Sequence, residues 1–289
     1  MSRRYVVVDA FSAVPLLGNP VAVVLDAEGL DTAQMQAIAR WTNLSETTFV
    51  LPATTPDADY QLRIFTPASE LAFAGHPTLG SAKAIMDSGL ATPRDGKLVQ
   101  QCKAGLIEIR ISGEDSDTMF VLQLPQAEII TLPDDQSAQL ERTFGIRLKP
   151  DYAFASVNVG IAWGIAEVES VEALLDMVPD LNRCAALERN NRLTGISLFA
   201  RYENGDIEVR SFAAADGVPE DPVCGSGNGA IAAYRRHTGQ LPSTAWRYQS
   251  RQGRCVGRDG YVQISCDDQG VLRVGGHCVT TAEGVLALK

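Results

Sequence analysis

Hydrophobic and polar positions follow the same order twice along this chain. In the first half, short apolar runs rich in β-branched residues predict strands, and apolar positions three and four apart predict helices. The predicted elements are strands over residues 5–11, 21–25, 47–51 and 61–65, a helix over 31–42 with Asp31 as its N-cap, and a helix over 78–88 that stops at Gly89. This order predicts a lobe of mixed strands and helices.

The second half repeats this order. Its predicted elements are strands over 157–166, 195–202 and 206–212 with the hairpin turn Asn204-Gly205, a short helix over 171–177, and a helix over 228–237 followed by Gly239. Arg63 and Arg210 end equivalent strands 147 positions apart, and Gly75 and Gly225 begin equivalent helices 150 positions apart. The repeat predicts a duplicated fold with a pseudo-twofold axis.

A polar and acidic segment, residues 115–150, separates the two halves and places the domain boundary near Gln126. We therefore expect an N-terminal lobe over residues 1–126 and a C-terminal lobe over 127–277. Further strand-like segments follow at 261–265, 271–274 and 284–288. We expect a final strand within 278–289 to return to the N-terminal lobe and complete it.

Two glycine-rich turns stand out. The first glycine turn, residues 73–80, reads Phe-Ala-Gly-His-Pro-Thr-Leu-Gly, and the second glycine turn, residues 220–229, reads Glu-Asp-Pro-Val-Cys-Gly-Ser-Gly-Asn-Gly. Each leads into an Ala-rich helix, so backbone N–H groups at the helix start can face an anion. With one such turn in each half, we expect one small anionic substrate to be held in a cleft between two similar lobes.

Charge and composition exclude several classes of partner. The formal net charge of −10 argues against nucleic acid and against an anionic membrane surface as binding partners. No apolar run approaches the ~18 residues of a spanning helix. The six cysteines form no Cys-x-x-Cys pair and the three histidines no His-x-x-x-His pair, so we expect reduced thiols, a cytoplasmic location and no metal site.

Residues 225–230 also satisfy the dinucleotide pattern Gly-x-Gly-x-x-Ala. The residues before it do not form a buried parallel strand, and no acidic residue ends a second strand about 20 positions later. We therefore expect no nicotinamide or flavin cofactor, and no other cofactor is predicted.

Two side chains of the first half are candidates for proton transfer. Glu46 lies where a helix has ended and a strand begins, and a carboxylate half-buried there could have a raised pKa and act as a general base. The alternative is a solvated surface glutamate. His76 lies at a helix start, where a neutral imidazole is favoured. The alternative is a histidine that caps or packs the helix.

The second glycine turn carries Asp221, Cys224 and Ser226. Asp221 is either an acid/base or an ordinary turn aspartate before proline. A thiol at a helix start could be a nucleophile or base, but the first-half equivalent of Cys224 is Ala74, which argues against a paired-thiol mechanism. A buried, inert cysteine is the alternative. Ser226 could bind substrate or cap the helix.

Several motifs together, in order, resemble the phenazine-biosynthesis PhzF-type isomerase family. They are Gly18-Asn19-Pro20-Val21-Ala22-Val23, Asn43-Leu44-Ser45-Glu46-Thr47, Arg63-Ile64-Phe65-Thr66-Pro67, residues 70–78, residues 221–227 and the closing Gly275-Gly276-His277. The resemblance covers nearly the whole chain. One departure is Val223-Cys224-Gly225-Ser226, where many family members have Ala-Thr-Gly-Ser; the cysteine is closer to related epimerases and racemases.

This resemblance implies a diaminopimelate-epimerase-like α+β roll: two pseudo-symmetric lobes, each a mixed, largely antiparallel sheet around a central helix. It implies cofactor-free and metal-free proton transfer on a small carboxylate, and a homodimer. By motif match, the expected catalytic residues are Glu46, His76 and Asp221, with Cys224 as a possible further acid/base. The expected substrate-binding residues are Asn19, Gly75, Gly225, Ser226 and Gly227.

We therefore expect an isomerase in which Glu46 moves a proton on a small carboxylate. One alternative is an amino-acid epimerase or racemase that uses Cys224 as a base. Another is a non-catalytic protein that binds a small molecule.

Overall fold

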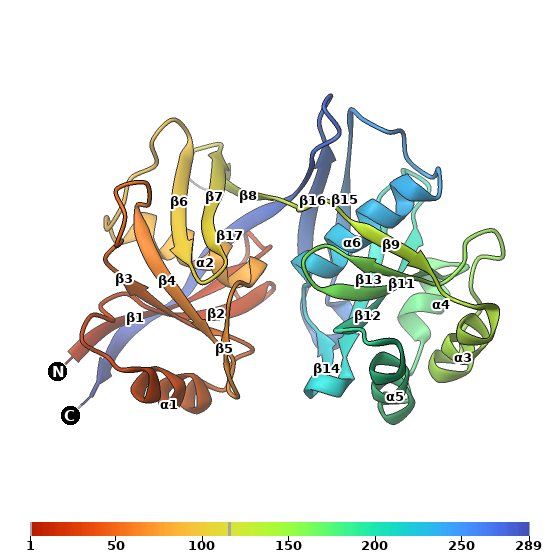
Figure 1. Cartoon of the computed structure of the whole chain (residues 1–289), viewed down its shortest axis with the longest axis horizontal. Coiled ribbons are helices and arrows are strands. Elements are labelled where there is room, and N and C mark those ends of the chain that lie inside the picture. Colours follow the sequence, from red (N-terminus) through yellow and green to blue (C-terminus); the bar gives the residue numbers. More distant parts are fainter. Residues whose placement is uncertain (1, 115–116, 289) are drawn as a thin grey trace. The chain divides into compact units, whose positions relative to one another are not determined.

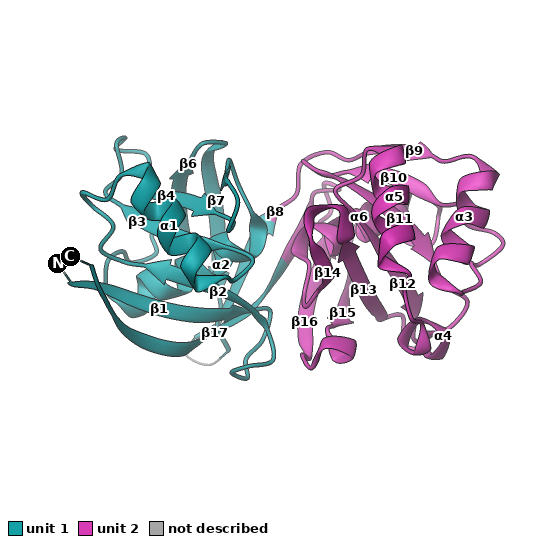
Figure 2. Ribbon diagram, turned by 90° about the horizontal axis from the view of Figure 1, so that it is seen from below, with its two compact units in different colours: residues 1–122, 275–289 teal, residues 123–274 magenta. Residues whose placement is uncertain are grey.

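The computed structural model describes residues 2–114 and 117–288 and divides into two compact units (Figure 2). Unit 1 comprises Met1–Leu122 and Gly275–Lys289, and unit 2 comprises Gln123–Val274. The expected boundaries, residues 126 and 277, lie a few positions later than these. The chain thus leaves unit 1 once, forms unit 2 and returns along its last strand.

Unit 1 is a ring of strands. Its strands are β1 (Ser2–Ala10), β2 (Asn19–Val24), β3 (Thr47–Leu51), β4 (Tyr60–Phe65), β5 (Glu70–Leu71), β6 (Lys97–Cys102), β7 (Gly105–Ser112), β8 (Met119–Gln123) and β17 (Leu272–Ala287). Successive pairings run β1–β2–β3–β4–β6–β7–β8–β17 and close through β17–β1. The pairs β2–β3 and β4–β6 are parallel and the remaining pairs with known register are antiparallel, so the sheet is mixed.

One helix is central to unit 1. Helix α2 (Gly75–Asp87) packs against β1, β2 and β3, and most of its residues are buried (Figure 1). Gly80 allows this close approach, because a Cβ atom there would lie 2.4 Å from Cγ1 of Val21. Helix α1 (Thr32–Thr42) covers β3 and β4 from outside; its predicted N-cap, Asp31, forms a capping box with Gln34.

Unit 2 has the same plan. Its strands are β9 (Glu128–Thr131), β10 (Ala155–Asn158), β11 (Ala162–Glu167), β12 (Gly195–Arg201), β13 (Ile207–Ala213), β14 (Val218–Asp221), β15 (Trp246–Gln252) and β16 (Gly260–Cys266), and its helices are α3 (Asp134–Phe144), α4 (Val171–Asp176), α5 (Leu181–Asn191) and α6 (Gly225–His237). The pairs β11–β12 and β13–β15 are parallel, as β2–β3 and β4–β6 are in unit 1. Helix α6 packs against β10, β11, β12 and β16 and is buried over most of its length.

The two units match element by element. The central helices α2 and α6 both have 13 residues and begin 150 positions apart. The outer helices α1 and α5 both have 11 residues, begin 149 positions apart, and start from an aspartate N-cap. The predicted α+β class, two similar halves each built on a mixed sheet around a central helix, is confirmed.

Several local predictions are wrong. The continuous strand over 157–166 is two strands, β10 and β11, because the chain turns at Gly160 with a φ of 103°. The polar segment between the halves, for which no elements are predicted, contributes β8, β9 and α3. Helices α2 and α6 begin at Gly75 and Gly225, as the equivalent glycines predict, so they include the three residues before the helical runs expected over 78–88 and 228–237. The strand-like segments predicted over 271–274 and 284–288 fall largely within one strand, β17 (Leu272–Ala287).

The six cysteines are all free. Within residues 2–114 and 117–288, no helix is both long and apolar enough to cross a membrane. Strand β14, which leads to the second glycine turn, pairs antiparallel with β13 and is only four residues long. Strand β14 is therefore not the buried parallel strand that precedes the glycine turn of a dinucleotide site, as the sequence predicts.

Candidate functional site

In unit 1 the structure brings Glu46 and His76 together. Glu46 precedes β3 and His76 is the second residue of α2; Oε2 of Glu46 lies 3.2 Å from Nε2 of His76. At this distance the two groups form an ion pair whenever the imidazole is protonated and the carboxylate is ionised. On the other ring nitrogen, Nδ2 of the buried Asn19 lies 3.5 Å from Nδ1 of His76. The parallel pair β2–β3 causes this meeting, since both strands begin beside the start of α2.

Burial sets the protonation of Glu46. Its side chain is 15% exposed, and loss of solvation raises its pKa to about 7, while a hydrogen bond from Ser45 acts in the opposite direction. A carboxyl group with a pKa near 7 can both give and accept a proton at neutral pH. The alternative of a solvated surface glutamate is wrong for this residue.

The start of α2 has no side-chain cap. Its N-cap is Ala74, which makes no capping hydrogen bond, and Pro77 lacks an N–H group. The partial positive charge of the helix start is therefore directed toward the Glu46–His76 pair without neutralisation by a capping side chain. This environment favours negative charge at the first glycine turn.

In unit 2 the second glycine turn is more tightly filled. Cys224 is the N-cap of α6, and its Sγ accepts a hydrogen bond from the N–H of Gly227 at 3.3 Å. Burial raises the pKa of the Cys224 thiol well above its usual value, and the nearby Asp221 carboxylate adds to this shift. The thiol is therefore protonated near neutral pH, whatever the helix start contributes.

Asp221 and Ser226 flank this thiol. Oδ1 of Asp221 accepts a hydrogen bond from the N–H of Val223 at 3.0 Å, and Oγ of Ser226 lies 3.6 Å from Sγ of Cys224. Trp163, on β11, donates its indole N–H to Oγ of Ser226 at 3.1 Å. Because indole nitrogen only donates, this contact leaves the hydroxyl proton of Ser226 for another acceptor, one of which is Sγ of Cys224.

The internal repeat shows how the two sites differ. Phe65 and Phe212 are equivalent, 147 positions apart, and they pair with Thr47 and Ile196. Glu46, which precedes Thr47, is therefore equivalent to Gly195. A Cβ atom at Gly195 would lie 2.3 Å from the carbonyl oxygen of Phe212, so no carboxylate fits there.

The helix starts align at an offset of 150 positions. His76 is the second residue of α2 and Ser226 is the second residue of α6. Unit 1 thus carries a carboxylate–imidazole pair where unit 2 carries a glycine and a hydroxyl. The two glycine turns are alike in backbone and unlike in chemistry.

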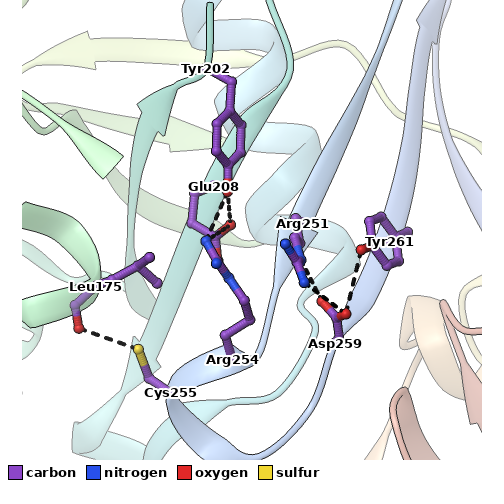
Figure 3. A network of polar contacts seen from close by, with 8 residues as sticks. All are labelled: Leu175, Tyr202, Glu208, Arg251, Arg254, Cys255, Asp259 and Tyr261. Atoms are coloured by element: carbon purple, nitrogen blue, oxygen red, sulfur yellow. Dashed lines mark hydrogen bonds and ion pairs between the residues drawn. The ribbon is translucent and has the colours of Figure 1, made fainter. Parts of the chain in front are cut away.

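A large cavity lies elsewhere in unit 2. It has a volume of about 890 Å³ and is lined by side chains from α4, β13, β15 and β16. Its two guanidinium groups are already paired, Arg254 with Glu208 and Arg251 with Asp259 (Figure 3). It contains none of the residues of either glycine turn, so its size does not make it the reaction site.

Sequence reasoning missed three side chains around the second glycine turn. Trp163 holds Ser226, and the fully buried Asn228 and Gln252 hydrogen-bond to each other at 2.9 Å beneath the turn. Trp163 sits in an apolar run that predicts only a strand. Gln252 follows no motif, since its role comes from the pairing of β15 with β13. The repeat gives no signal either, because the equivalent position in unit 1 is Cys102.

Comparison with known proteins fits this architecture. The family model for phenazine biosynthesis-like proteins, PhzC-PhzF, matches residues 8–284. The chain is 38% identical over 96% of its length to antisense-enhancing sequence 1 of Schizosaccharomyces pombe, covering 96% of that protein. It is 33% identical to trans-2,3-dihydro-3-hydroxyanthranilate isomerase of Pseudomonas aeruginosa, over 98% of each chain.

Solved structures agree. The crystal structure of a Bacillus anthracis phenazine biosynthesis protein of the PhzF family superposes over 100% of both chains with a TM-score of 0.89 at 25% identity. A probable proline racemase from Agrobacterium radiobacter, at 15% identity and a TM-score of 0.66 over 99% of this chain and 93% of that one, shares the fold alone. The fold is therefore the diaminopimelate-epimerase-like α+β roll, and the chain belongs to the phenazine biosynthesis-like (PhzC-PhzF) family of isomerases.

Proposed function

We propose that this protein is an isomerase that moves a proton on a small carboxylate, with Glu46 as the acid/base. The observation that carries this proposal is the Glu46–His76 contact of 3.2 Å in a site where the pKa of Glu46 is raised to about 7. A group with this pKa can take a proton from an activated carbon and return it elsewhere without a large energetic penalty in either step.

His76 assists in this proposal. Its Nε2 faces Glu46 and its Nδ1 faces Asn19, so the ring can relay charge while its orientation stays fixed. The uncapped start of α2, at Gly75, would stabilise negative charge that develops on the substrate. Asn19 acts here through His76, which refines its expected role in substrate binding.

Unit 2 contributes binding groups in this proposal. The hydroxyl of Ser226, oriented by Trp163, and the N–H of Gly225 would bind the substrate carboxylate. Asp221 is the proposed second acid/base. The N–H of Gly227 already donates to Cys224, so we assign Gly227 to packing, where a Cβ atom would lie 2.3 Å from Oγ of Ser197.

We infer that Cys224 is a structural cap rather than a base. Its thiol accepts the hydrogen bond that begins α6, and burial holds its pKa well above the usual value, which leaves little thiolate. The equivalent N-cap in unit 1 is Ala74, so no second thiol is available. The epimerase alternative with Cys224 as a base therefore has no specific observation in its favour.

The test is a screen of small carboxylates in deuterated water, read by mass shift and including trans-2,3-dihydro-3-hydroxyanthranilate, the compound in the name of the 33% identical relative. We expect deuterium in one substrate with the wild-type protein. Glu46→Gln should lower that rate by about 10³-fold or more, because it removes the proton-transfer group. Glu70→Gln, a carboxylate in a separate ion pair of the same unit, should leave the rate within about threefold.

Two outcomes would refute the proposal. If Glu46→Gln kept the full rate on an identified substrate, Glu46 would not be the acid/base. If Cys224→Ser abolished deuterium incorporation at an α-carbon while Glu46→Gln did not, the epimerase alternative would be correct.

A further inference from the structure

The second glycine turn is held from below by one side chain. Gln252, the last residue of β15, is fully buried. Its Oε1 accepts hydrogen bonds from the N–H of Cys224 at 3.1 Å and from Nδ2 of Asn228 at 2.9 Å. Its Nε2 donates to the carbonyl oxygen of Asp221 at 2.9 Å. One amide thus contacts the turn at its start, at the helix cap and in the first turn of α6.

The backbone beside Gln252 is equally close to the turn. Gly253 has a φ of 105°, and a Cβ atom there would lie 2.6 Å from the carbonyl oxygen of Pro222. Asn228 ties the same region together, since its Nδ2 also donates to the carbonyl oxygen of Cys224 at 2.9 Å. The end of β15 and the second glycine turn are therefore packed backbone to backbone.

Arg251, directly before Gln252, and Arg254, two residues after it, are both anchored by carboxylates. Arg251 forms a bidentate pair with Asp259, and Arg254 donates to Glu208 and to the hydroxyl of Tyr202 (Figure 3). Because side chains alternate along a strand, fixing Arg251 on one face fixes the inward direction of Gln252 on the other. The Arg251–Asp259 pair of Figure 3 is therefore consistent with the inward direction of the Gln252 amide.

Unit 1 holds its glycine turn through different contacts. The position equivalent to Gln252 is Cys102, since β4 pairs with β6 as β13 pairs with β15. There the buried Gln100, two residues earlier on β6, donates from Nε2 to Oγ1 of Thr78 at 3.1 Å. Gln252 thus clamps the turn that carries Asp221 and Ser226, whereas Cys102 has no amide group with which to do the same in unit 1.

We propose that Gln252 is the positioning residue of the second glycine turn, which its single amide holds at Asp221, Cys224 and Asn228 so that Asp221 and Ser226 keep the geometry the reaction needs. This inference rests on the proposed function for its role in turnover. The clamp itself can be tested without a substrate.

The first experiment is hydrogen–deuterium exchange of the full-length protein, read by mass spectrometry. Gln252→Met keeps the side-chain volume and removes all three hydrogen bonds. We expect exchange in peptides spanning 221–228 to become faster by on the order of tenfold or more, with β12 unchanged, because only the turn loses its partners. Tyr234→Phe is the control: it removes a buried hydrogen bond of 2.6 Å from the same helix, away from the turn.

A pH profile separates positioning from general loss of stability. In Gln252→Glu the protonated carboxyl group reproduces the amide, with one oxygen as acceptor and one O–H as donor to Asp221. The ionised form instead places a buried negative charge against the carbonyl oxygen of Asp221. Protection of the turn, and turnover relative to wild type, should therefore recover as the pH falls in Gln252→Glu and should not recover in Gln252→Met.

Turnover completes the test on the carboxylate that wild type labels in deuterated water. Gln252→Met should lower kcat by on the order of tenfold or more with a smaller change in KM, and Tyr234→Phe should not. Unchanged exchange at 221–228 in Gln252→Met, or faster exchange with unchanged kcat, would overturn the inference. Failure of the proposed function is distinct: Glu46→Gln would then keep its activity while the turn still loosened in Gln252→Met.

Discussion

Burial of Glu46 should make stability depend on pH in an unusual direction. The folded pKa of Glu46 is about 7 against the usual value of 4.5 for a solvated glutamate, so the folded protein holds this proton more tightly than the unfolded chain. The stability that protonated Glu46 supplies is therefore complete below pH 4.5 and is lost as the pH rises through about 7. The difference of about 2.5 between the folded and unfolded pKa of Glu46 corresponds to at most about 3 kcal/mol of unfolding free energy.

Glu46→Gln removes this dependence, because glutamine does not titrate. We expect the unfolding free energy of the variant minus that of wild type to be constant below pH 4.5, to rise by up to about 3 kcal/mol by pH 8, and to level off there. Urea denaturation of the full-length protein at each pH gives this difference. A carbon-13 NMR titration of the Glu46 carboxyl, assigned by its absence in Glu46→Gln, should have its midpoint near pH 7.

Glu70 provides a control of opposite sign. It is similarly recessed, with 11% of its side chain exposed, but hydrogen bonds from Arg63 and Lys103 lower its pKa. Its stabilising contribution is present above pH 4.5 and is lost as the pH falls through the lowered folded value. The unfolding free energy of Glu70→Gln minus that of wild type should therefore fall as the pH rises. A flat difference for Glu46→Gln would show that its carboxyl group titrates like a solvated one and would refute the mechanism built on it.

Three further predictions test the surroundings. Iodoacetamide at pH 7.5 should alkylate the exposed Cys255 on the order of ten times faster than the buried, capping Cys224, as peptide mass spectrometry would show; equal rates would contradict the structural assignment of that thiol. Arg210→Met should lower the unfolding free energy by about 3–5 kcal/mol in urea denaturation, because Glu220, whose side chain is only 8% exposed, loses its cation. The equivalent Arg63→Met should lower it by less, since Lys103 still pairs with Glu70. Gly195→Ala should cost about 1–3 kcal/mol or more, because the added methyl meets a backbone oxygen that cannot move aside; a thermal midpoint equal to that of wild type would disprove this close approach.

Local signals predicted local structure well. Strand β3 has the bounds that its apolar run indicates, and Asp31 caps α1 as its position before the helix predicts. Helix α3 was missed because only three of its residues are buried, so its polar sequence reads as a linker. Helix α5 does carry a readable signal, a capping Asp180 followed by buried positions at helical spacing.

The geometry and burial of the candidate site depend on contacts between residues distant in sequence, which hydrophobic patterns and motifs do not specify. The motif resemblance selects Glu46 and His76, but their 3.2 Å contact follows from the parallel register of β2 and β3. Burial of Glu46, which decides its pKa, depends on neighbours distant in sequence. Gln252 is invisible for the same reason, since its partners lie 24 to 31 positions away across a strand pairing.

The path of β17 has a consequence for how the chain folds during synthesis. Residues 278–287 pair with β1 along its whole length, yet they are made only after all of unit 2. Unit 2 is contiguous in sequence, so it can complete its sheet while unit 1 still has an open edge at β1. We therefore expect the unit made last to be finished first, with the nascent β1 edge exposed to other chains or to chaperones until the final strand arrives.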